Sequence, residues 1–311
     1  MAVYEIGNYI HDMRVERGYS QEELCFGICS VGNLSKIENG TRMPNRKTVE
    51  ALTQRLGCGE TFLQYSSREE MQQVEICSRI VRKITNYEYE GLEELIDRFE
   101  RTIAKGDILN SQYCRFTRII VKQRKNQDWE GAIEELEETL RMTKPNGIAM
   151  ENILKGLLTY NEMVILINIA RAYRKLGRRD KAIEILFGLK QYMDTHMIDR
   201  KEKVQKYPMI LFNLSNLLLD EHKFSDVVEL CNQGIAMSQE NNRFCLFPEF
   251  LINRGLALLE LQEREQAEES LVKGCCAFYA LGNRAQCERL QTFLKENWQM
   301  ESVILDEIVK I

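Results

Sequence analysis

Side chains that could hydrogen-bond to a nucleic acid gather in one short stretch near the N-terminus. Asn33 carries an amide that both donates and accepts, which suits the edge of a base pair in the major groove. From Lys36 to Lys47 there are four cations and one anion, Glu38, and cations suit the phosphate backbone.

A second polar set consists of asparagines that recur at one phase of the later sequence. Three of them stand fourteen residues before a small or branched apolar residue, and two more lie within two turns of those three. Asparagine amides in a row can hold the main chain of an extended peptide, and nearby cations can bind a carboxylate. The alternative, that each asparagine ties neighbouring helices together, stays open. The predicted peptide-binding residues are Asn161, Asn168, Arg171, Arg174, Lys206, Asn213, Asn216 and Asn253.

The sequence contains none of the common catalytic signatures. It has no P-loop, no G-x-G-x-x-G, no G-x-S-x-G and no H-E-x-x-H. Its ten cysteines form no C-x-x-C pair, and its three histidines are scattered away from them, so the ligand spacing of a zinc site is absent. We therefore predict no enzyme activity, no cofactor and no metal, and cysteines that serve as small buried residues.

Capping residues define the elements that must position the first set. Ser20 and Glu23 form an S-x-x-E capping box, Ser30 can cap the next helix, and Asn39-Gly40 ends it. Apolar spacing adds a helix before this pair and two after it. The five predicted helices are Tyr4 to Glu16, one from Ser20 with Leu24 and Ile28 on its apolar face, one from Ser30, Thr48 to Leu56 and Thr61 to Tyr65.

The run S-Q-E-E-L, a short turn and then L-S-K-I-E-N-G resembles the helix-turn-helix of phage repressor and Cro-like domains, the XRE type. That resemblance implies a second helix that enters the major groove of DNA. The candidate base-edge or near-groove residues that it implies are Ser30, Val31, Gly32, Asn33 and Lys36, the candidate phosphate contacts are Gln21, Arg42, Arg46 and Lys47, and Ser35 completes the predicted DNA-binding set. The alternative is an ordinary helical hairpin whose polar face is only solvated.

Beyond Ser66-Ser67 the sequence becomes a series of long helical segments. Five places carry a similar signature, of which Arg179-Asp180-Lys181-Ala182 is the clearest, and a small residue precedes the last three by twelve positions. The pattern resembles tetratricopeptide repeats, although the spacing exceeds their usual length. We therefore expect an all-α fold: a five-helix repressor-like helix-turn-helix domain (residues 1–66), then a tetratricopeptide-like α-solenoid (67–311) of about five helix pairs and a C-terminal capping helix, for peptide binding and dimerisation.

Composition limits the class of protein. With 311 residues, 44% hydrophobic and 29% charged, the chain can bury a core. No segment reaches the roughly 18 consecutive apolar residues of a membrane span, and the N-terminus lacks the pattern of a signal peptide. We therefore expect a cytoplasmic protein with no membrane partner. The net charge of −5 predicts weak non-specific DNA binding and a need for dimerisation.

The order of the two regions resembles the RRNPP group of quorum-sensing regulators, the Rgg and PlcR type. This resemblance implies a homodimeric transcription factor that reads an inverted repeat in double-stranded DNA and is controlled by a short signalling peptide. Two alternatives remain open. One is a repeat scaffold for a protein partner, and the other is a repressor that responds to no peptide.

Overall fold

The computed structural model describes residues 3–58, 68–85, 88–147, 149, 151 and 156–298, all of whose regular elements are helices. The chain forms two compact units, Met1–Lys203 and Val204–Ile311. The predicted helix over Thr61 to Tyr65 and the predicted domain boundary at Ser66-Ser67 lie outside the described residues. Within those described, no helix is both long and apolar enough to cross a lipid bilayer.

The first unit begins with a helix-turn-helix. Ser20 makes the predicted capping box with Glu23, and the Ser30 side chain accepts a hydrogen bond from the Asn33 amide. Both caps satisfy backbone N–H groups that a helix start leaves unpaired. The four helices are α1 (Val3–Glu16), α2 (Gln21–Cys25), α3 (Val31–Glu38) and α4 (Arg46–Arg55).

Two predicted boundaries of the helix-turn-helix need correction. The helix that starts after Ser20 ends at Cys25 and does not reach Ile28, because Gly27 adopts a φ of 70°. The fourth helix starts at Arg46 and not at Thr48, because Asn45 caps it through the backbone N–H of Thr48. The core of this region is formed by buried residues from all four helices, among them Ile10, Leu24, Leu34, Ile37, Leu52 and Leu56.

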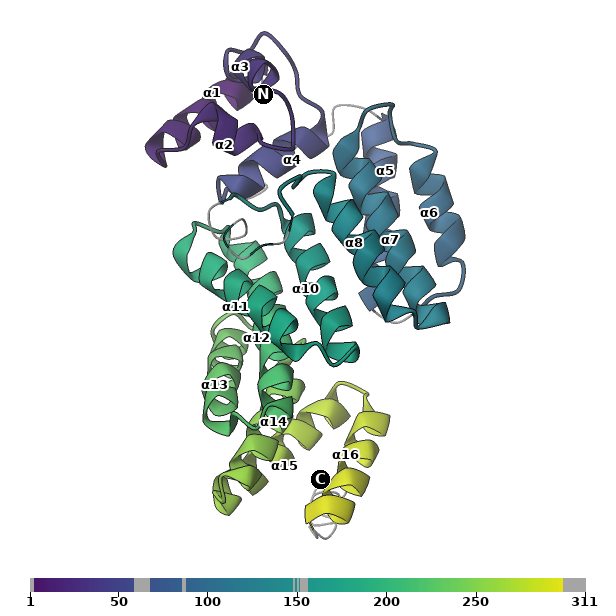
Figure 1. Ribbon diagram of the computed structural model, residues 1–311, viewed down its shortest axis with the longest axis vertical. Coiled ribbons are helices and arrows are strands. Elements are labelled where there is room, and N and C mark those ends of the chain that lie inside the picture. The colour runs from purple at the N-terminus through teal and green to yellow at the C-terminus, as the bar shows by residue number, and fades with distance from the viewer. Residues whose placement is uncertain are drawn as a thin grey trace. The chain divides into compact units, whose positions relative to one another are not determined.

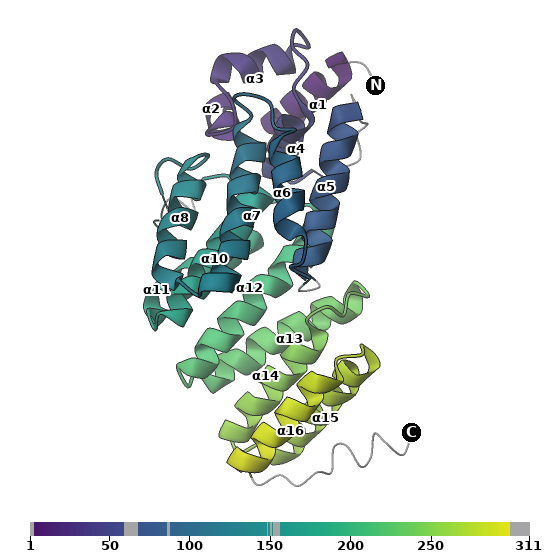
Figure 2. The same cartoon turned by 90° about the vertical axis from the view of Figure 1, so that its right-hand side faces the viewer.

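Antiparallel helix pairs make up the rest of the first unit. In Figure 2 the helices from α5 to α8 lie side by side, and each packs on the next along the chain. Helix α10 packs on both α8 and α11. The bounds are α5 (Arg68–Thr85), α6 (Leu92–Glu100), α7 (Ile108–Asn126), α8 (Trp129–Arg141), α10 (Tyr160–Lys175) and α11 (Arg179–Thr195).

The second unit continues the same pattern. Helix α14 packs on α13 and α15, and α16 closes the series against α15. Its core includes Leu258, Leu271, Cys275 and Leu294. The bounds are α12 (Arg200–Asp220), which starts in the first unit, α13 (Phe224–Glu240), α14 (Phe247–Glu260), α15 (Arg264–Ala280) and α16 (Arg284–Trp298).

The predicted packing phase of the repeats is confirmed. Ala170 and Leu186 are buried in the pair α10 and α11. At Gly255 an added Cβ would lie 2.6 Å from Cγ of Leu271, so only a residue without a side chain lets α14 approach α15 this closely. The signature that ends in Ala182 falls at the start of the second helix of its pair, as the tetratricopeptide resemblance implies.

Candidate functional site

Helix α3 presents one face to solvent and the other to the core. Leu34 and Ile37 are buried, whereas Gly32 and Lys36 are exposed and Val31 is 44% exposed. Apart from the neighbouring residues and the backbone of α3 itself, no atom of the described chain lies within 4 Å of a Cβ built on Gly32. The exposed face therefore has room for a ligand close to the helix backbone.

Asn33 is held in a defined orientation by Arg42. The Arg42 guanidinium donates to Oδ1 of Asn33 at 2.8 Å. Because only the amide oxygen can accept from a guanidinium, this bond fixes which side of the amide faces Arg42 and does not use the amide N–H donors. The structure thus brings together two of the predicted DNA-binding residues.

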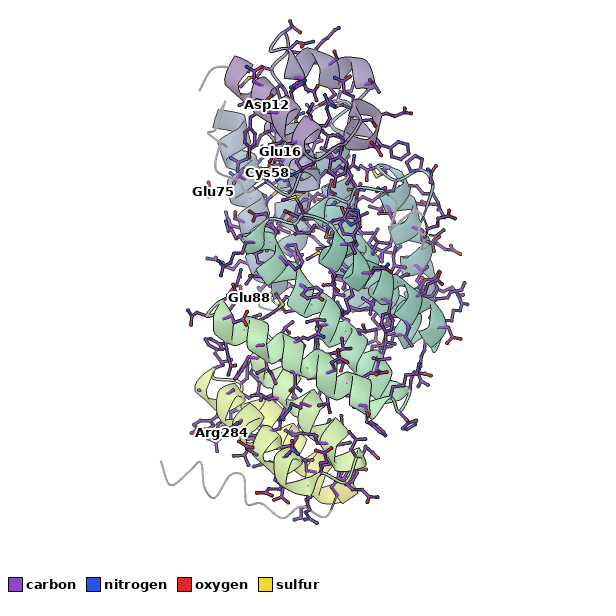
Figure 3. The ribbon with its side chains drawn as sticks, turned by 90° about the vertical axis from the view of Figure 1, so that its left-hand side faces the viewer. Asp12, Glu16, Cys58, Glu75, Glu88 and Arg284 are labelled. Atoms are coloured by element: carbon purple, nitrogen blue, oxygen red, sulfur yellow. The ribbon has the colours of Figure 1, made fainter. Side chains whose placement is uncertain are left out.

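Helix α3 carries one acidic residue, and that charge is neutralised inside the domain. Glu38 is 3% exposed and accepts two hydrogen bonds from Arg14, at 2.7 and 2.9 Å. Burial raises the pKa of Glu38, but the hydrogen bonds from Arg14 and Gln21 outweigh it and hold the pKa below its usual value. Because Glu38 is the one acid of α3 and is paired with Arg14, the outward face of α3 carries no unpaired acid. The exposed acids Asp12 and Glu16 lie on α1 (Figure 3).

Four other predicted DNA contacts have partners within the protein. Gln21 donates its amide to Glu38 at 2.7 Å, and the hydroxyl of Ser35 lies 3.5 Å from the Asn39 amide. Arg46 and Lys47 contact Glu50 at 2.6 and 3.2 Å. The Nζ atom of Lys47 also lies 5.8 Å from the ring centre of Tyr113 on α7, on the side of the repeats. Their contacts with DNA remain predictions.

The predicted peptide-binding residues of the first unit lie on α10. Asn168 donates its amide to the carbonyl of Val164 at 2.8 Å and accepts from Arg171 at 3.2 Å. Asn161 donates to Oε1 of Gln112 on α7 at 2.8 Å, so it ties two helices together. Arg174 is half-buried near the end of the same helix.

In the second unit Asn253 supports the structural alternative. It is 7% exposed and donates to Ser215 at 3.0 Å and to Asn216 at 3.2 Å, so it joins α14 to α12. Asn213 instead donates to the carbonyl of Met209 on its own helix, at 2.7 Å, and is half-buried. Lys206 is also half-buried on α12.

The sequence analysis missed one buried carboxyl oxygen and one buried ion pair. Glu249 lies one turn before Asn253 on α14, and burial raises the pKa of its carboxyl; among the described residues its Oε2 has no hydrogen-bond partner. Arg55 on α4 and Glu162 on α10 form a fully buried ion pair. The T-x-x-E capping box at Thr159 signals the start of α10 and the part that Glu162 plays in it, but it does not signal the pairing with Arg55.

The cysteines are free thiols, and most are buried. Burial raises the pKa of Cys77 and Cys29 to about 11, which keeps both thiols protonated at neutral pH. In the described part of the chain, no group of three or more His, Cys, Asp or Glu side chains could hold a metal ion.

Comparisons with known proteins agree with this architecture. The Helix-turn-helix family matches residues 10–63, and the RNPP family C-terminal domain matches residues 78–298. No curated protein matches the sequence. A crystal structure of Bacillus thuringiensis PlcR in complex with the peptide PapR7 and DNA is 19% identical, with a TM-score of 0.60, and the match covers 92% of this chain and 99% of that one.

The apo form of the competence regulator ComR from Streptococcus vestibularis is 15% identical, with a TM-score of 0.53 over 95% of this chain and 99% of that one. At these identities the two structures establish the shared fold. The C-terminal family match extends over more than half of the sequence, and the chain therefore belongs to the RNPP family.

Proposed function

We propose that this protein is a cytoplasmic DNA-binding transcriptional regulator whose repeats bind a short signalling peptide that controls DNA binding. The observation that carries the proposal is the exposed polar face of α3, in a chain with an RNPP C-terminal domain. Ser30 caps this helix, and Arg14 neutralises the charge of its one acid, Glu38. The structurally similar PlcR was crystallised with both a peptide and DNA, which supports the same pairing of ligands here.

DNA is read from the first turns of α3. Asn33, oriented by Arg42, offers its N–H donors to acceptors on a base edge, such as N7 of a purine. Val31 offers an apolar surface that suits the methyl group of thymine, and Gly32 lets the helix approach closely. Lys36 contacts phosphate or a base edge from the exposed side of the helix.

The reading unit is a homodimer on an inverted repeat. One α3 helix contacts only a few base pairs, and the chain's net charge of −5 gives little general attraction to DNA. A second copy, with its recognition helix about one DNA turn or 34 Å away, supplies the missing contacts.

The peptide binds along the first helices of the repeats. Asn168 and Asn213 each use their N–H groups on a carbonyl one turn earlier, and this bond orients the amide. Within its own unit, each Oδ1 atom then acts as an acceptor for a main-chain N–H group of a bound peptide. In the second unit Glu249 offers a buried acceptor that suits an N–H or a cationic group of a peptide.

Selection from a pool of random double-stranded DNA tests the proposal. The full-length protein is incubated with the pool, with and without the low-mass peptide fraction of a dense culture of the source organism, and the bound DNA is sequenced. We expect enrichment of a short inverted repeat whose extent changes with the peptide fraction. Failure to enrich any sequence in both conditions, with folded protein at low salt, would contradict the proposed function.

A further inference from the structure

The C-terminal end of α4 contacts the start of α10 within the first unit. In Figure 1, α4 lies between the other helices of the helix-turn-helix and the first turn of α10. The side chain of Arg55 is fully buried there, and Nη1 donates to the carbonyls of Leu24 at 2.9 Å and Phe26 at 2.5 Å. Nη2 lies 3.5 Å from Oε1 of Glu162. One guanidinium thus binds the segment that precedes the recognition helix and a carboxylate of the repeats.

The same contact completes the cap of α10. Glu162 accepts from the backbone N–H of Thr159 at 2.6 Å, and its own N–H donates to the Thr159 hydroxyl at 3.3 Å. The next N–H in this turn, that of Tyr160, donates to Oε1 of Gln54 at 3.1 Å. A helix start leaves its first N–H groups unpaired, and here the DNA-binding domain supplies one of the missing acceptors. Helix α4 is therefore part of the structure that starts α10.

Two glycines show how closely the backbones meet on either side of this contact. A Cβ added at Gly27 would lie 1.8 Å from the carbonyl oxygen of Thr143, and one added at Gly57 would lie 2.1 Å from that of Met197. Both pairs join the helix-turn-helix to loops of the repeats. The buried ion pair thus lies in a region where the helix-turn-helix and the repeats are in close backbone contact.

A buried ion pair contributes little net stability, since the cost of removing both charges from water offsets their attraction, but it penalises any arrangement that separates them. Its energetic effect is therefore on orientation. Lys144 is a third buried charge beside the pair, at 8% exposed, so a displaced Glu162 would leave two cations without their shared carboxylate.

We propose that Arg55 and Glu162 form a positioning pair that fixes the orientation of the recognition helix on α10. Arg55 bonds to a carbonyl of the segment that precedes α3, and its partner Glu162 is the residue next to Asn161 on α10. A shift of α10 is carried through Glu162 to the DNA-binding domain. The consequence for DNA spacing rests on the proposed function, whereas the mechanical coupling does not.

The experiment is a distance measurement on the full-length protein. Spin labels are introduced as non-natural amino acids at the exposed residues Glu22 on α2 and Glu134 on α8, and pulsed electron resonance gives the distance distribution. We expect one narrow distribution in the labelled parent. Glu162→Gln removes the charge and keeps an acceptor for the cap, and it should broaden or split the distribution. An unchanged distribution in folded Glu162→Gln protein overturns the positioning role.

Two further variants control for a general loss of stability. Glu38→Gln breaks an ion pair of the same chemistry inside the helix-turn-helix, and it should leave the distance distribution narrow. Gln54→Ala removes only the neutral half of the contact with α10, and it should broaden the distribution less than Glu162→Gln does. If Glu162→Gln does not fold, Arg55→Lys decides, because a lysine cannot bond to the carbonyls before α3 and to Glu162 at once: a distribution as narrow as in the parent overturns the proposal.

A DNA readout separates this inference from the proposed function. Inverted repeats with different half-site spacings are titrated against the parent and Glu162→Gln. The positioning role predicts that the variant loses the spacing preference and keeps its affinity for a single half-site. A parent protein that binds no inverted repeat counts against the proposed function alone, because the distance distributions do not depend on DNA.

Discussion

Replacing Gly27 by alanine tests the contact between the helix-turn-helix and the repeats most simply. Gly27 has a φ of 70°, and a Cβ placed on it would lie 1.8 Å from the carbonyl oxygen of Thr143. Gly18 offers a matched control, since it has nearly the same φ of 72° and, apart from its chain neighbours, no described atom lies within 4 Å of the position of a Cβ. The two substitutions therefore share the backbone strain and differ in the clash.

The magnitudes follow from these two terms. A left-handed conformation costs alanine about 1–2 kcal/mol, and both variants bear that cost. Forcing an extra carbon into a packed contact costs a further ~1–3 kcal/mol, because backbone on one side has to move. We therefore expect a loss of stability of about 1–2 kcal/mol for Gly18→Ala and about 2–5 kcal/mol for Gly27→Ala.

The assay is urea unfolding of the full-length protein, followed by helical circular dichroism, with the parent and both variants measured together. The Gly27→Ala protein should unfold at a clearly lower urea concentration than the Gly18→Ala protein. Equal midpoints would refute the reasoning, because they would mean that the contact between Gly27 and Thr143 is open in solution.

Three further predictions concern charge and DNA binding. Burial and the nearby Arg55 lower the pKa of Lys144 to about 8, while Glu162 opposes the shift. Because the unfolded chain binds this proton more tightly, the free energy of unfolding should rise as the pH increases from about 8 to the usual lysine pKa. Lys144→Met should abolish that rise when unfolding is measured across this pH range. Asn33→Ala should reduce discrimination between specific and random DNA more than it reduces total affinity, and a proportionate loss on both in titrations would count against base reading. Lys36→Ala should reduce the slope of log affinity against log salt concentration by about one phosphate contact. Lys47→Ala should reduce this slope less, because the Lys47 side chain lies against Tyr113. Equal effects of the two substitutions on the salt slope would oppose this assignment.

Local sequence signals predicted the helix-turn-helix well. The capping box at Ser20 and the cap at Ser30 are short-range chemistry, and both are present as expected. The errors at Gly27 and Asn45 are also local. A glycine can adopt a positive φ or remain helical, and an asparagine next to a proline can cap a helix or lie in a loop, so context decides each case.

The contact between Arg55 and Glu162 could not be predicted from the sequence. The two residues are 107 positions apart, and neither pattern nor spacing connects them. An arginine in the last turn of a helix interacts favourably with the helix dipole, so its position in α4 indicates only a solvated cation. Its burial follows only from how α4 packs on α10, which depends on the whole first unit.

The asparagines show where sequence phase stops being informative. Asn213 and Asn253 share the same phase relative to the following helix, yet Asn213 bonds to its own helix and Asn253 joins α14 to α12. The difference comes from Ser215 and Asn216, which stand opposite Asn253 and offer it acceptors. A common phase predicts a common face and leaves the bonding partner undetermined.

Binding of the full-length protein to its selected inverted repeat, compared with a scrambled duplex of the same length and composition, tests the central claim most directly. Titrations at about 50 and 200 mM salt give both specificity and salt dependence. We expect the inverted repeat to bind at least about a thousandfold more tightly than the scrambled duplex, and we expect the affinity to fall steeply with salt. Equal affinity for the two duplexes, or binding that does not respond to salt, would contradict it and favour a scaffold whose helix-turn-helix serves folding or dimerisation.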